Sequence, residues 1–536
     1  MIENPVIRGF NPDPSVIRVG DDFYVATSTF EWWPGVCIYH SRDLRHWRLH
    51  SRPLDRMSML DLTGVPDSGG VWAPDITYDG KTFYLVYTNV RERGPMMQTD
   101  NYVVMTDDID GEWSEPVYLN SMGFDPSMFH DRDGRTWLLS LNNHYGKNQR
   151  FNGLYIQEFD TRSRRLVGDV RLIYREPHGE LVEGSHIYHF GDTYYLLKAQ
   201  GGTGRRHSAQ LSRSQSLYGP WEDCPDILLH SRDDVSLPLQ CAGHADILDT
   251  PDGELFLFHL ATRYSSEGHS IFGRETCLQR IEWTSDGWLR LSDGGQNPHV
   301  YVSEPDLPEH KFPADDGVYD FTCGPLPDCF QSLRLPLGDR IRFTGSALSL
   351  RGSNGLNSRF EQTLLARRID SARVRISTRL LFEPEHEKHM AGLILIYDTQ
   401  NWHYLYVTRS ERGQKQVCVL TCNKGAMEYP AEPIAINEST DIELHADING
   451  ADLHFSFSDG GELRSIGGEL DINILADVAF TGAMAGICCQ DLMRKEKCAE
   501  FHWFRYETCS DNNSDNNSDY NSNYNNSRKV NEKWIS

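Results

Sequence analysis

One pattern returns five times in the first three hundred residues of the chain. Each copy begins with a polar residue, continues through a short apolar strand and a Gly/Asp turn, and ends in an aromatic or aliphatic strand. The copies read "DPSVIRVGDDFYVATST", "APDITYDGKTFYLVYT", "DPSMFHDRDGRTWLLSLNN", "EGSHIYHFGDTYYLLKAQGG" and "GHADILDTPDGELFLFHLATR". Their polar markers, at intervals of 62, 50, 58 and 61 residues, are Asp13, Asp75, Asp125, Glu183 and His244. Two short strands around a turn are typical of a β-hairpin, so the pattern predicts repeated hairpins.

Copies of about 60 residues leave room for roughly four strands each. Four-stranded units repeated around an axis make a β-propeller, and helical periodicity is nearly absent from this region. Because the innermost strand of every blade runs along the axis, we expect the five markers to converge on one end of it. A simpler reading is that the markers only cap the turns of ordinary hairpins. That reading accounts for one or two of them, but not for an acid or a histidine at the same phase in all five.

The rest of the sequence divides the chain into further parts. A Pro- and acid-rich stretch, "SEPDLPEHKFPADDGVYDF", precedes a region in which apolar and polar residues alternate strictly, as in "RVRISTRL". Several antiparallel strands that each have one solvent-exposed and one buried face indicate a β-sandwich of the jelly-roll, lectin-like kind. We therefore expect an all-β chain with a five-bladed β-propeller at 1–303, a linker at 304–320, an antiparallel β-sandwich at 321–508 and a disordered Asn/Ser-rich tail at 509–536.

Charge and cysteine content limit the partners and the compartment. Lysine and arginine number 52 and aspartate and glutamate 77, which gives a formal net charge of −25. We therefore expect no nucleic acid and no membrane as a partner, because binding to phosphates needs a basic face. No apolar stretch approaches the roughly 18 residues of a membrane span, and the N-terminal "MIENPVIRGF" has no signal-peptide pattern. Twelve cysteines without CxxC pairs are typical of reduced thiols, so we expect a cytoplasmic protein.

Three acids stand beside residues with special backbone properties: proline, which fixes the backbone, or glycine, which allows close approach. Asp13 lies between two prolines, Asp125 precedes a proline in "GFDPSMF", and Glu183 precedes a glycine in "LVEGSH". Proline fixes its own φ and restricts the residue before it, so Asp13 is immobilised just before a strand. Large flat side chains and one cation lie near the same phase of the repeat: Phe30, Trp72, Phe124 and Arg274.

A cluster of this kind suits the cleavage of a glycosidic bond. One carboxylic acid protonates the leaving oxygen while one carboxylate activates water, and aromatic faces hold the apolar side of a sugar ring. Asp125 would raise the pKa of Glu183 by like-charge repulsion, with Arg274 moderating the field. Two other readings stay open, a non-catalytic glycan-binding propeller and a purely structural platform.

Eight motifs, in order along the chain, resemble glycoside hydrolase family 43. They are "GFNPDPS", "TSTFEWWPGV", "PDSGGVWAPD", "GFDPSMF", "VEGSH", "AQGGT", "AGHAD" and "FGRET". The similarity covers roughly residues 3–300, continues more weakly to about 507, and is greatest to two-domain β-xylosidases and α-L-arabinofuranosidases. The resemblance implies a five-bladed propeller and an inverting mechanism. By position, Asp13 matches the general base, Glu183 the general acid, and Asp125 the third acid, which tunes the pKa of the general acid and orients it.

The resemblance also implies which residues surround the terminal sugar. Phe30, Trp72, Phe124 and Arg274 match substrate contacts, Thr203 lies in the "GGT" turn near the acid, and His244 matches an axial histidine. In some relatives this histidine sits beside a metal ion. An axial calcium near His244 is therefore kept as an alternative to a simple buried histidine, while the chemistry itself requires no cofactor and no catalytic metal.

Three departures from the family pattern bear on substrate choice. Ser185 stands where a proline is usual, and Gln200 stands where a glutamate is common. Asn142 and Asn143 replace a tryptophan of some close β-xylosidases, so a stacking wall is missing beside the predicted substrate contact Asn143. Its loss makes acceptance of arabinofuranose more plausible.

We therefore expect an inverting exo-glycosidase that releases xylose from the non-reducing end of β-1,4-xylooligosaccharides and also acts on α-L-arabinofuranosides. The alternative is an α-L-arabinofuranosidase as the main activity. Expected partners are a xylooligosaccharide or arabinoside substrate and further copies of the chain in a homo-oligomer. In such relatives the sandwich sends a loop to the pocket, and "FTGAM" (Phe480–Met484) corresponds to that loop. Otherwise the sandwich only covers a propeller flank or mediates oligomerisation.

Overall fold

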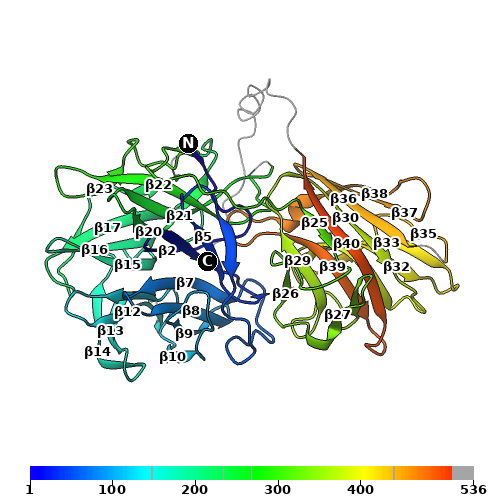
Figure 1. The fold of residues 1–536 in the computed structure, drawn as a ribbon, viewed down its shortest axis with the longest axis horizontal. Coiled ribbons are helices and arrows are strands. Elements are labelled where there is room, and N and C mark those ends of the chain that lie inside the picture. The colour runs from blue at the N-terminus through cyan, green and yellow to red at the C-terminus, as the bar shows by residue number, and fades with distance from the viewer. Residues whose placement is uncertain (147–148, 233, 267, 439–440, 510–536) are drawn as a thin grey trace.

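The structure is a computed structural model that describes residues 1–146, 149–232, 234–266, 268–438 and 441–509. Within these ranges the chain forms β-strands and two short 3-10 helices, η1 (Gly338–Arg340) and η2 (Ile472–Leu475), and contains no α-helix. A propeller, blue to green, lies beside a sandwich, yellow-green to red (Figure 1). The expected all-β fold is thereby confirmed. No helix in the described part of the chain has the length and apolarity to cross a bilayer.

Each blade contains four successive antiparallel strands, and blade 4 carries β19 (Leu229–His230) as a fifth. The strands of blades 1 and 2 are β2 (Ser15–Val19), β3 (Asp22–Thr27), β5 (Cys37–Ser41), β6 (Arg48–Ser51), and β7 (Gly70–Tyr78), β8 (Phe83–Glu92), β9 (Gln98–Thr106), β10 (Val117–Asn120). Those of blades 3 and 4 are β11 (Ser127–His130), β12 (Thr136–Gly146), β13 (Gln149–Asp160), β14 (Arg165–Tyr174), and β15 (Val182–Phe190), β16 (Thr193–Gln200), β17 (Ser208–Ser214), β18 (Glu222–Asp223). Those of blade 5 are β20 (Gln240–Asp249), β21 (Leu255–Thr262), β22 (Glu275–Trp283) and β23 (Leu289–Leu291).

Apolar clusters fill the spaces between neighbouring blades. Between blades 5 and 1, for example, Val25 of β3 packs in one cluster with Phe258 of β21, and both are fully buried. The first strand of each blade packs beside the first strand of the next, and β20 of the last blade lies against β2 of the first. Because both faces of a blade are covered, the central strands are almost continuously apolar rather than alternating. The five blades therefore form a closed ring around a central axis.

The N-terminal segment closes the ring. β1 (Ile2–Glu3) pairs with β24 (Tyr301–Val302), which follows the last blade. Asn4 is 2% exposed and binds β22 through its side chain: Nδ2 donates to Leu278 O (2.7 Å) and to His299 O (2.9 Å), while Oδ1 accepts from Leu278 N (2.9 Å). One amide side chain thus satisfies both backbone groups of a residue in the last blade.

Two antiparallel sheets form the sandwich around a large apolar core. The strands of one sheet are β27 (Ile341–Phe343), β28 (Leu348–Arg351), β40 (Cys498–Thr508), β30 (Arg373–Leu381), β36 (Ile442–Asn449), β37 (Asp452–Ser458) and β38 (Arg464–Asp471), with β25 (Val318–Asp320) beside β40. Those of the other are β34 (Ala426–Glu428), β33 (Lys415–Asn423), β32 (Asn401–Arg409), β31 (His389–Asp398), β39 (Met484–Asp491), β29 (Thr363–Arg368), β26 (Gln331–Leu333) and β4 (Trp32–Trp33), with β35 (Ile434–Ala435) beside β33.

The alternation of apolar and polar residues in the sandwich sequence corresponds to buried and exposed side chains. In β30 the side chains of Val374 and Ile376 are buried, whereas those of Arg373 and Arg375 are exposed. β25 lies within the stretch 304–320 that the sequence suggests as a linker, and it already pairs with β40. The expected tail at 509–536 lies, from residue 510 on, outside the described residues.

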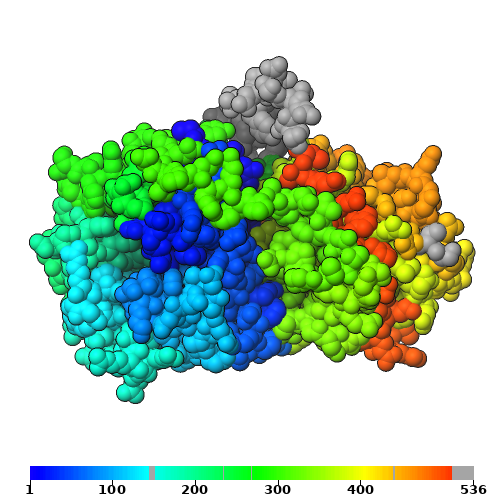
Figure 2. Space-filling model, viewed as in Figure 1, coloured from blue at the N-terminus to red at the C-terminus, as the bar shows by residue number. Residues whose placement is uncertain are grey.

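One sandwich sheet extends into the propeller. β4 belongs to the connection between β3 and β5 of blade 1, yet it pairs with β26, with Trp33 opposite Ser332 and Trp32 opposite Leu333. In Figure 2 the two bodies abut along a continuous boundary. Backbone pairing across this boundary fixes the sandwich relative to the end of the propeller that carries the β3–β5 connection.

We expect Asn4→Leu to lower the free energy of unfolding by about 2–4 kcal/mol, because it leaves buried backbone groups of Leu278 without partners. The measurement is the thermal and urea unfolding of the purified full chain. Glu3→Gln is the matched control, since the Arg8–Glu3 ion pair has side chains that are 49% and 53% exposed and contributes little. Equal stability of the two variants would contradict the closing role of Asn4.

Candidate functional site

A residue with positive φ stands at the equivalent place of each of the five blades, in the inner strand or just before it. These residues are Asp13 (56°), Ala73 (34°), Asp125 (53°), Gly184 (51°) and His244 (44°). Positive φ is uncommon for residues other than glycine, and such backbone strain clusters at functional sites. All five line one cavity of about 10 Å³ on the axis, which has room for roughly one water molecule.

The repeat therefore has a different phase from the one that its polar markers suggest. Ala73 rather than Asp75 holds the equivalent place in blade 2, and Gly184 rather than Glu183 holds it in blade 4. The expectation of an acid or a histidine at one phase in all five copies is wrong. Asp75 lies two residues further along its strand and faces the axis again, because side chains alternate with a period of two.

Asp13 is 4% exposed, and different partners hold its two carboxylate oxygens. Oδ2 accepts a hydrogen bond from Ser28 Oγ (2.6 Å), and Oδ1 pairs with Arg274 Nη1 (2.7 Å). Ser28 Oγ in turn accepts from the backbone N–H of Ala73 (2.7 Å), which links blades 1 and 2 at this level. Asp13 is thus fixed in position, and the guanidinium balances its charge.

Asp125 and Glu183 are buried carboxyl groups in the field of Asp13. Burial, and then the charge of Asp13, raises the pKa of Glu183 to about 7 against the opposing charge of Arg274. Burial, and then the charges of Glu183 and Asp13, raises the pKa of Asp125 well above its usual value. Because like charges in one buried site oppose each other's ionisation, this part of the site keeps a proton near neutral pH.

Gly184 brings the turn after Glu183 against His244. A Cβ at Gly184 would lie 2.7–2.9 Å from atoms of the His244 ring, so no larger residue fits. Burial lowers the pKa of His244 to about 4, although the charge of Asp13 opposes this shift. The imidazole is therefore neutral, and its Nδ1 lies 3.6 Å from Asp13 Oδ1 and 3.9 Å from Asp125 Oδ2.

The three predicted aromatic residues form one wall. The ring of Trp72 lies 5.7 Å from that of Phe30 and 5.6 Å from that of Phe124, measured between ring centroids. The side chain of Trp72 is held by a hydrogen bond from Nε1 to Ser68 O (3.1 Å). Phe30 is 1% exposed and Trp72 9%, so Trp72 offers the more accessible face of the two.

The sandwich adds a fourth aromatic side chain to this wall. The ring of Phe480 stands edge-on to Phe30 (5.3 Å, 90°) and to Trp72 (5.8 Å, 84°). Arg274 Nε donates to Phe480 O (3.0 Å), and the guanidinium lies 4.9 Å from the ring centroid. Asp477 Oδ1 accepts from the backbone N–H of Phe480 (2.9 Å). The segment Phe480–Met484 therefore does reach the site, and both domains build its wall.

The other two predicted contacts lie at the margin. Asn143 is half-buried; its backbone N–H donates to Met122 O (2.8 Å), and its Nδ2 lies 3.7 Å from Met97 Sδ. Thr203 is also half-buried and lies in the turn after β16. The last residue of that strand, Gln200, pairs with Val182, the neighbour of Glu183. Contact of Phe30, Trp72, Phe124, Asn143, Thr203, His244 and Arg274 with a substrate stays a prediction.

Two residues that hold the site in place, Ser28 and His207, could not be recognised from the sequence. Ser28 lies in the run "TST", where nothing marks one hydroxyl as the partner of an acid fifteen residues away. His207 is fully buried beside His244: a Cβ at Gly243 would lie 2.2 Å from its ring. Burial, and then the charge of His244, lowers the pKa of His207 well below its usual value. No signal in "RRH" could have found it.

One group of described residues has three side chains close enough to hold a metal ion. The ligand atoms of Asp75, His186 and Asp246 lie within 4.8 Å of one another. Asp75 Oδ2 already accepts from Met128 N (2.7 Å), and Asp246 Oδ2 accepts from Val16 N (2.8 Å). Burial lowers the pKa of His186, but the charges of Asp246 and Asp75 outweigh it and raise the pKa to about 9.

A metal ion would have to displace the proton of this imidazole before the ring could bind it, because a protonated imidazole offers no lone pair. The imidazolium itself supplies the positive charge between the two carboxylates. Calcium beside His244 stays a prediction.

The arrangement is suited to acid–base chemistry on a polar ring. A fixed carboxylate, a carboxyl group whose pKa is near 7 and an aromatic wall converge at one end of a closed axis. A carboxyl group paired with a guanidinium, beside a second one whose pKa is raised by burial, can supply the base and the acid of a hydrolysis. Fold and site together define a hydrolase of the glycosidase type.

Comparison with known proteins identifies the family. The family model for glycosyl hydrolases family 43 matches residues 2–289, more than half of the chain, and the model for the β-xylosidase C-terminal concanavalin A-like domain matches residues 318–507. The chain therefore belongs to glycosyl hydrolase family 43, and the resemblance read from its motifs is confirmed, as is the lectin-like character of the sandwich.

Similar proteins span almost the whole chain. Xylosidase/arabinosidase 43B of Humicola insolens is 41% identical, over 94% of this chain and 97% of its own. A β-xylosidase of Bacillus subtilis is 38% identical, over 94% of this chain and 99% of its own. The crystal structure of the xylan β-1,4-xylosidase from Bacillus halodurans superposes with a TM-score of 0.93 at 42% identity and covers 95% of this chain and 100% of that one.

We expect Gly184→Ala to lower kcat/KM for a nitrophenyl glycoside about 100-fold, because the new methyl group displaces the Glu183 turn from His244. The matched control is Gly191→Ala in the hairpin turn of the same blade. Its φ of +60° imposes the same backbone strain as the +51° of Gly184, but a Cβ there meets nothing within 4 Å. An equal loss of activity in both variants would show that strain, and not contact with His244, matters.

Proposed function

We propose that this protein is an inverting, exo-acting β-xylosidase that releases xylose from the non-reducing end of β-1,4-xylooligosaccharides. The observation that carries the proposal is the pairing of unlike carboxyl groups. Asp13 is paired with the Arg274 guanidinium, whereas Glu183 has its pKa raised to about 7. Relatives that bear the name β-xylosidase align with nearly the whole chain.

In this proposal Asp13 acts as the general base. It takes a proton from a water molecule, and the water oxygen bonds to the anomeric carbon as the glycosidic bond breaks. Glu183 gives its proton to the departing oxygen and ends as a carboxylate. Asp125 is the third acid; burial and then the charges of Glu183 and Asp13 raise its pKa, whereas the carboxylate that raises the pKa of the buried Glu183 is Asp13 rather than the expected Asp125. Inversion needs room for the water, so we expect the carboxyl groups of Asp13 and Glu183 to lie about 6.5–9.5 Å apart.

The aromatic wall supports exo action on chain ends. Phe30, Trp72 and Phe480 pack against one another at ring distances of 5.3–5.8 Å. In this proposal the wall bounds one side of the terminal-sugar site, and a site that is closed at its end accepts a chain end but not the middle of a polymer. The propeller supplies the floor and the sandwich loop supplies part of the cover.

The second candidate is α-L-arabinofuranosidase activity. The printed name of the Humicola insolens relative combines xylosidase and arabinosidase. The amide of Asn143 lies 3.7 Å from Met97 Sδ, so this position itself offers no aromatic face. Both sugars are pentoses, and a pocket with one wall reduced has fewer contacts with which to separate them.

Further proposals concern the surroundings of the enzyme. We propose that hydrolysis needs no cofactor, because side chains supply both proton transfers. A homo-oligomer and a cytoplasmic location remain part of the proposal. For the location the support is that all twelve cysteines are free thiols, seven of them buried. Reduced thiols are the usual state in a reducing compartment.

Comparison of nitrophenyl β-D-xylopyranoside with nitrophenyl α-L-arabinofuranoside tests the activity. We expect a kcat/KM for the xyloside at least about tenfold higher, and α-xylose as the first product seen by NMR from xylobiose. EDTA-treated and untreated enzyme are compared in the same assay, and their rates should agree. A higher rate on the arabinoside would make the second candidate the main activity. Binding of xylobiose without any turnover would instead favour a glycan-binding propeller.

The pH profile tests the assignment of acid and base. Glu183 must carry its proton, so kcat/KM should fall as pH rises above about 7, the pKa of this group. Glu183→Gln should abolish that alkaline limb and lower the rate on xylobiose about 10³-fold. The same variant should lose much less activity on a dinitrophenyl xyloside, whose leaving group departs without a proton. Asp13→Asn should lose activity on both substrates. A loss of equal size on both substrates for Glu183→Gln would contradict its role as the acid.

A further inference from the structure

Arg334 is a sandwich residue that is buried against the propeller. It follows β26, is 1% exposed, and has a φ of +65°, which is rare for arginine. Its backbone N–H donates to Glu31 O (2.8 Å), one residue before β4. The pairing of β26 with β4 thus places the Arg334 side chain against the propeller.

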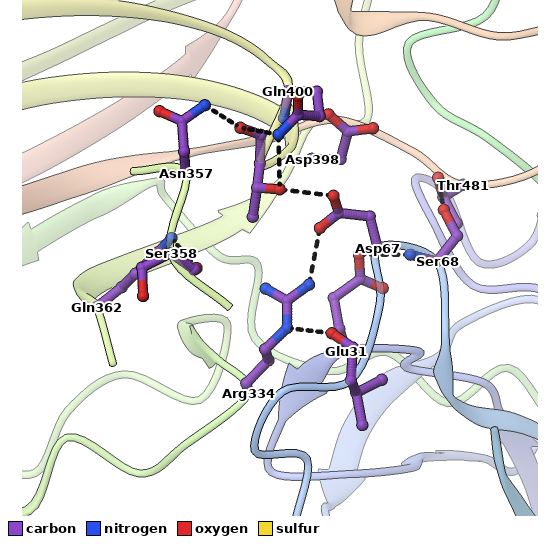
Figure 3. A network of polar contacts seen from close by, with 12 residues as sticks. Glu31, Asp67, Ser68, Arg334, Asn357, Ser358, Gln362, Asp398, Gln400 and Thr481 are labelled. Carbon is purple, nitrogen blue, oxygen red and sulfur yellow. Dashed lines mark hydrogen bonds and ion pairs between the residues drawn. The ribbon is translucent and has the colours of Figure 1, made fainter. Parts of the chain in front are cut away.

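The guanidinium of Arg334 binds one connection of the propeller at two points (Figure 3). Nε donates to Val65 O (2.7 Å), and Nη2 pairs with Asp67 Oδ1 (2.7 Å). Asp67 Oδ2 accepts a second hydrogen bond from Thr399 Oγ1 (2.6 Å), also from the sandwich. Two sandwich side chains therefore hold the segment that leads into β7.

That segment carries the support of the aromatic wall. Ser68 follows Asp67; its backbone N–H donates to Glu31 Oε1 (2.9 Å), and its carbonyl accepts from Trp72 Nε1 (3.1 Å). Ser68 Oγ lies 3.4 Å from Thr481 Oγ1, next to Phe480 (Figure 3). The chain of contacts from Arg334 thus ends on the indole of Trp72.

A second set of contacts, through Arg93, links Asp67 to the aromatic wall. Asp67 O accepts from Arg93 Nη1 (3.1 Å). The guanidinium of Arg93 lies 5.8 Å from the Trp72 ring centroid and 5.0 Å from that of Phe480. The position of the Asp67 backbone therefore also sets where this cation covers the two rings.

We propose that Arg334 is a positioning residue for substrate binding: through Asp67 and Ser68 it sets the place of Trp72 in the wall. Arg334 does not touch the pocket, so it acts only through these intermediates. The inference rests on the proposed function, in which Trp72 contacts the terminal sugar. A wall that shifts weakens the bound substrate and the transition state alike, which raises KM and leaves kcat nearly unchanged.

The test compares Arg334→Met with Arg340→Met in the full-length chain. Arg340 is also a buried sandwich arginine, 7% exposed, and it donates to backbone carbonyls of Gln362 (2.7 Å) and Pro336 (3.0 Å) within its own domain. We expect Arg334→Met to raise KM for xylobiose about fivefold to twentyfold and to weaken inhibition by free xylose by a similar factor, with kcat within about twofold. Arg340→Met should lower the unfolding temperature but leave both constants unchanged.

Two milder variants keep the test decisive if Arg334→Met fails to fold. Thr399→Val removes the second hydrogen bond to Asp67 (2.6 Å) and a long one from Gln400 Nε2 (3.5 Å), and we expect KM to rise about twofold to threefold. Arg334→Lys keeps a charge but cannot bond Val65 and Asp67 together, so KM should rise as well.

If KM and xylose inhibition stay at wild-type values in these variants, or change equally in Arg340→Met, the positioning role is overturned. If the wild-type enzyme hydrolyses neither xyloside nor arabinoside, the proposed function itself fails, which is a separate result.

Discussion

One buried guanidinium joins the base of the site to its cover. Arg274 pairs with Asp13 through Nη1 (2.7 Å) and donates from Nε to Phe480 O (3.0 Å). A buried charge is costly unless it is paired and hydrogen-bonded, so Asp13 and Arg274 stabilise each other's burial. Because the same side chain also binds the main chain of the sandwich loop, the positions of Asp13 and of Phe480 depend on one another. Ser28 completes the restraint from the opposite oxygen of Asp13.

Two layers of charge follow one another along the axis, and they are balanced differently. Around Asp13, three carboxyl groups share one arginine, so the excess of acids raises the pKa of Asp125 and Glu183. Two residues further along the inner strands, the imidazolium of His186 lies between Asp75 and Asp246. Backbone N–H groups donate to the Oδ2 atoms of both aspartates.

His244 belongs to the layer of Asp13 by its place in the repeat and is neutral. Its pKa is lowered by burial and by the charges of His186 and Arg274, although Asp13 opposes the shift. A neutral ring there avoids a third cation beside those of His186 and Arg274.

The sequence could predict the acids but not all that holds them. Asp13 and Asp125 are marked by adjacent prolines, which reveal a fixed backbone without any knowledge of the fold. The phase of the repeat could not be read correctly, because Ala73 carries no polar marker and only its φ of 34° identifies it. Phe480 was found through resemblance alone.

Arg334 had no signal, since its partner Asp67 lies 267 residues earlier in the chain. Contacts between distant segments depend on how the two domains dock. Strand alternation and turn residues report only local structure, so they leave such contacts unspecified.

The rigidity of the cover follows from close contact between backbones at the domain junction. A Cβ at Gly482 would lie 2.4 Å from Phe272 O, and one at Gly273 would lie 2.6 Å from Gly482 N. The main chains therefore touch with no side chain between them, and Ala483 N donates to Ile271 O (2.7 Å). Side chains can change rotamer at low cost, whereas a backbone held by such contacts cannot shift without breaking them. The place of Phe480 is thus set by how the sandwich docks on the propeller. The aromatic wall beside Asp13 is therefore a property of the junction between the domains rather than of the propeller alone.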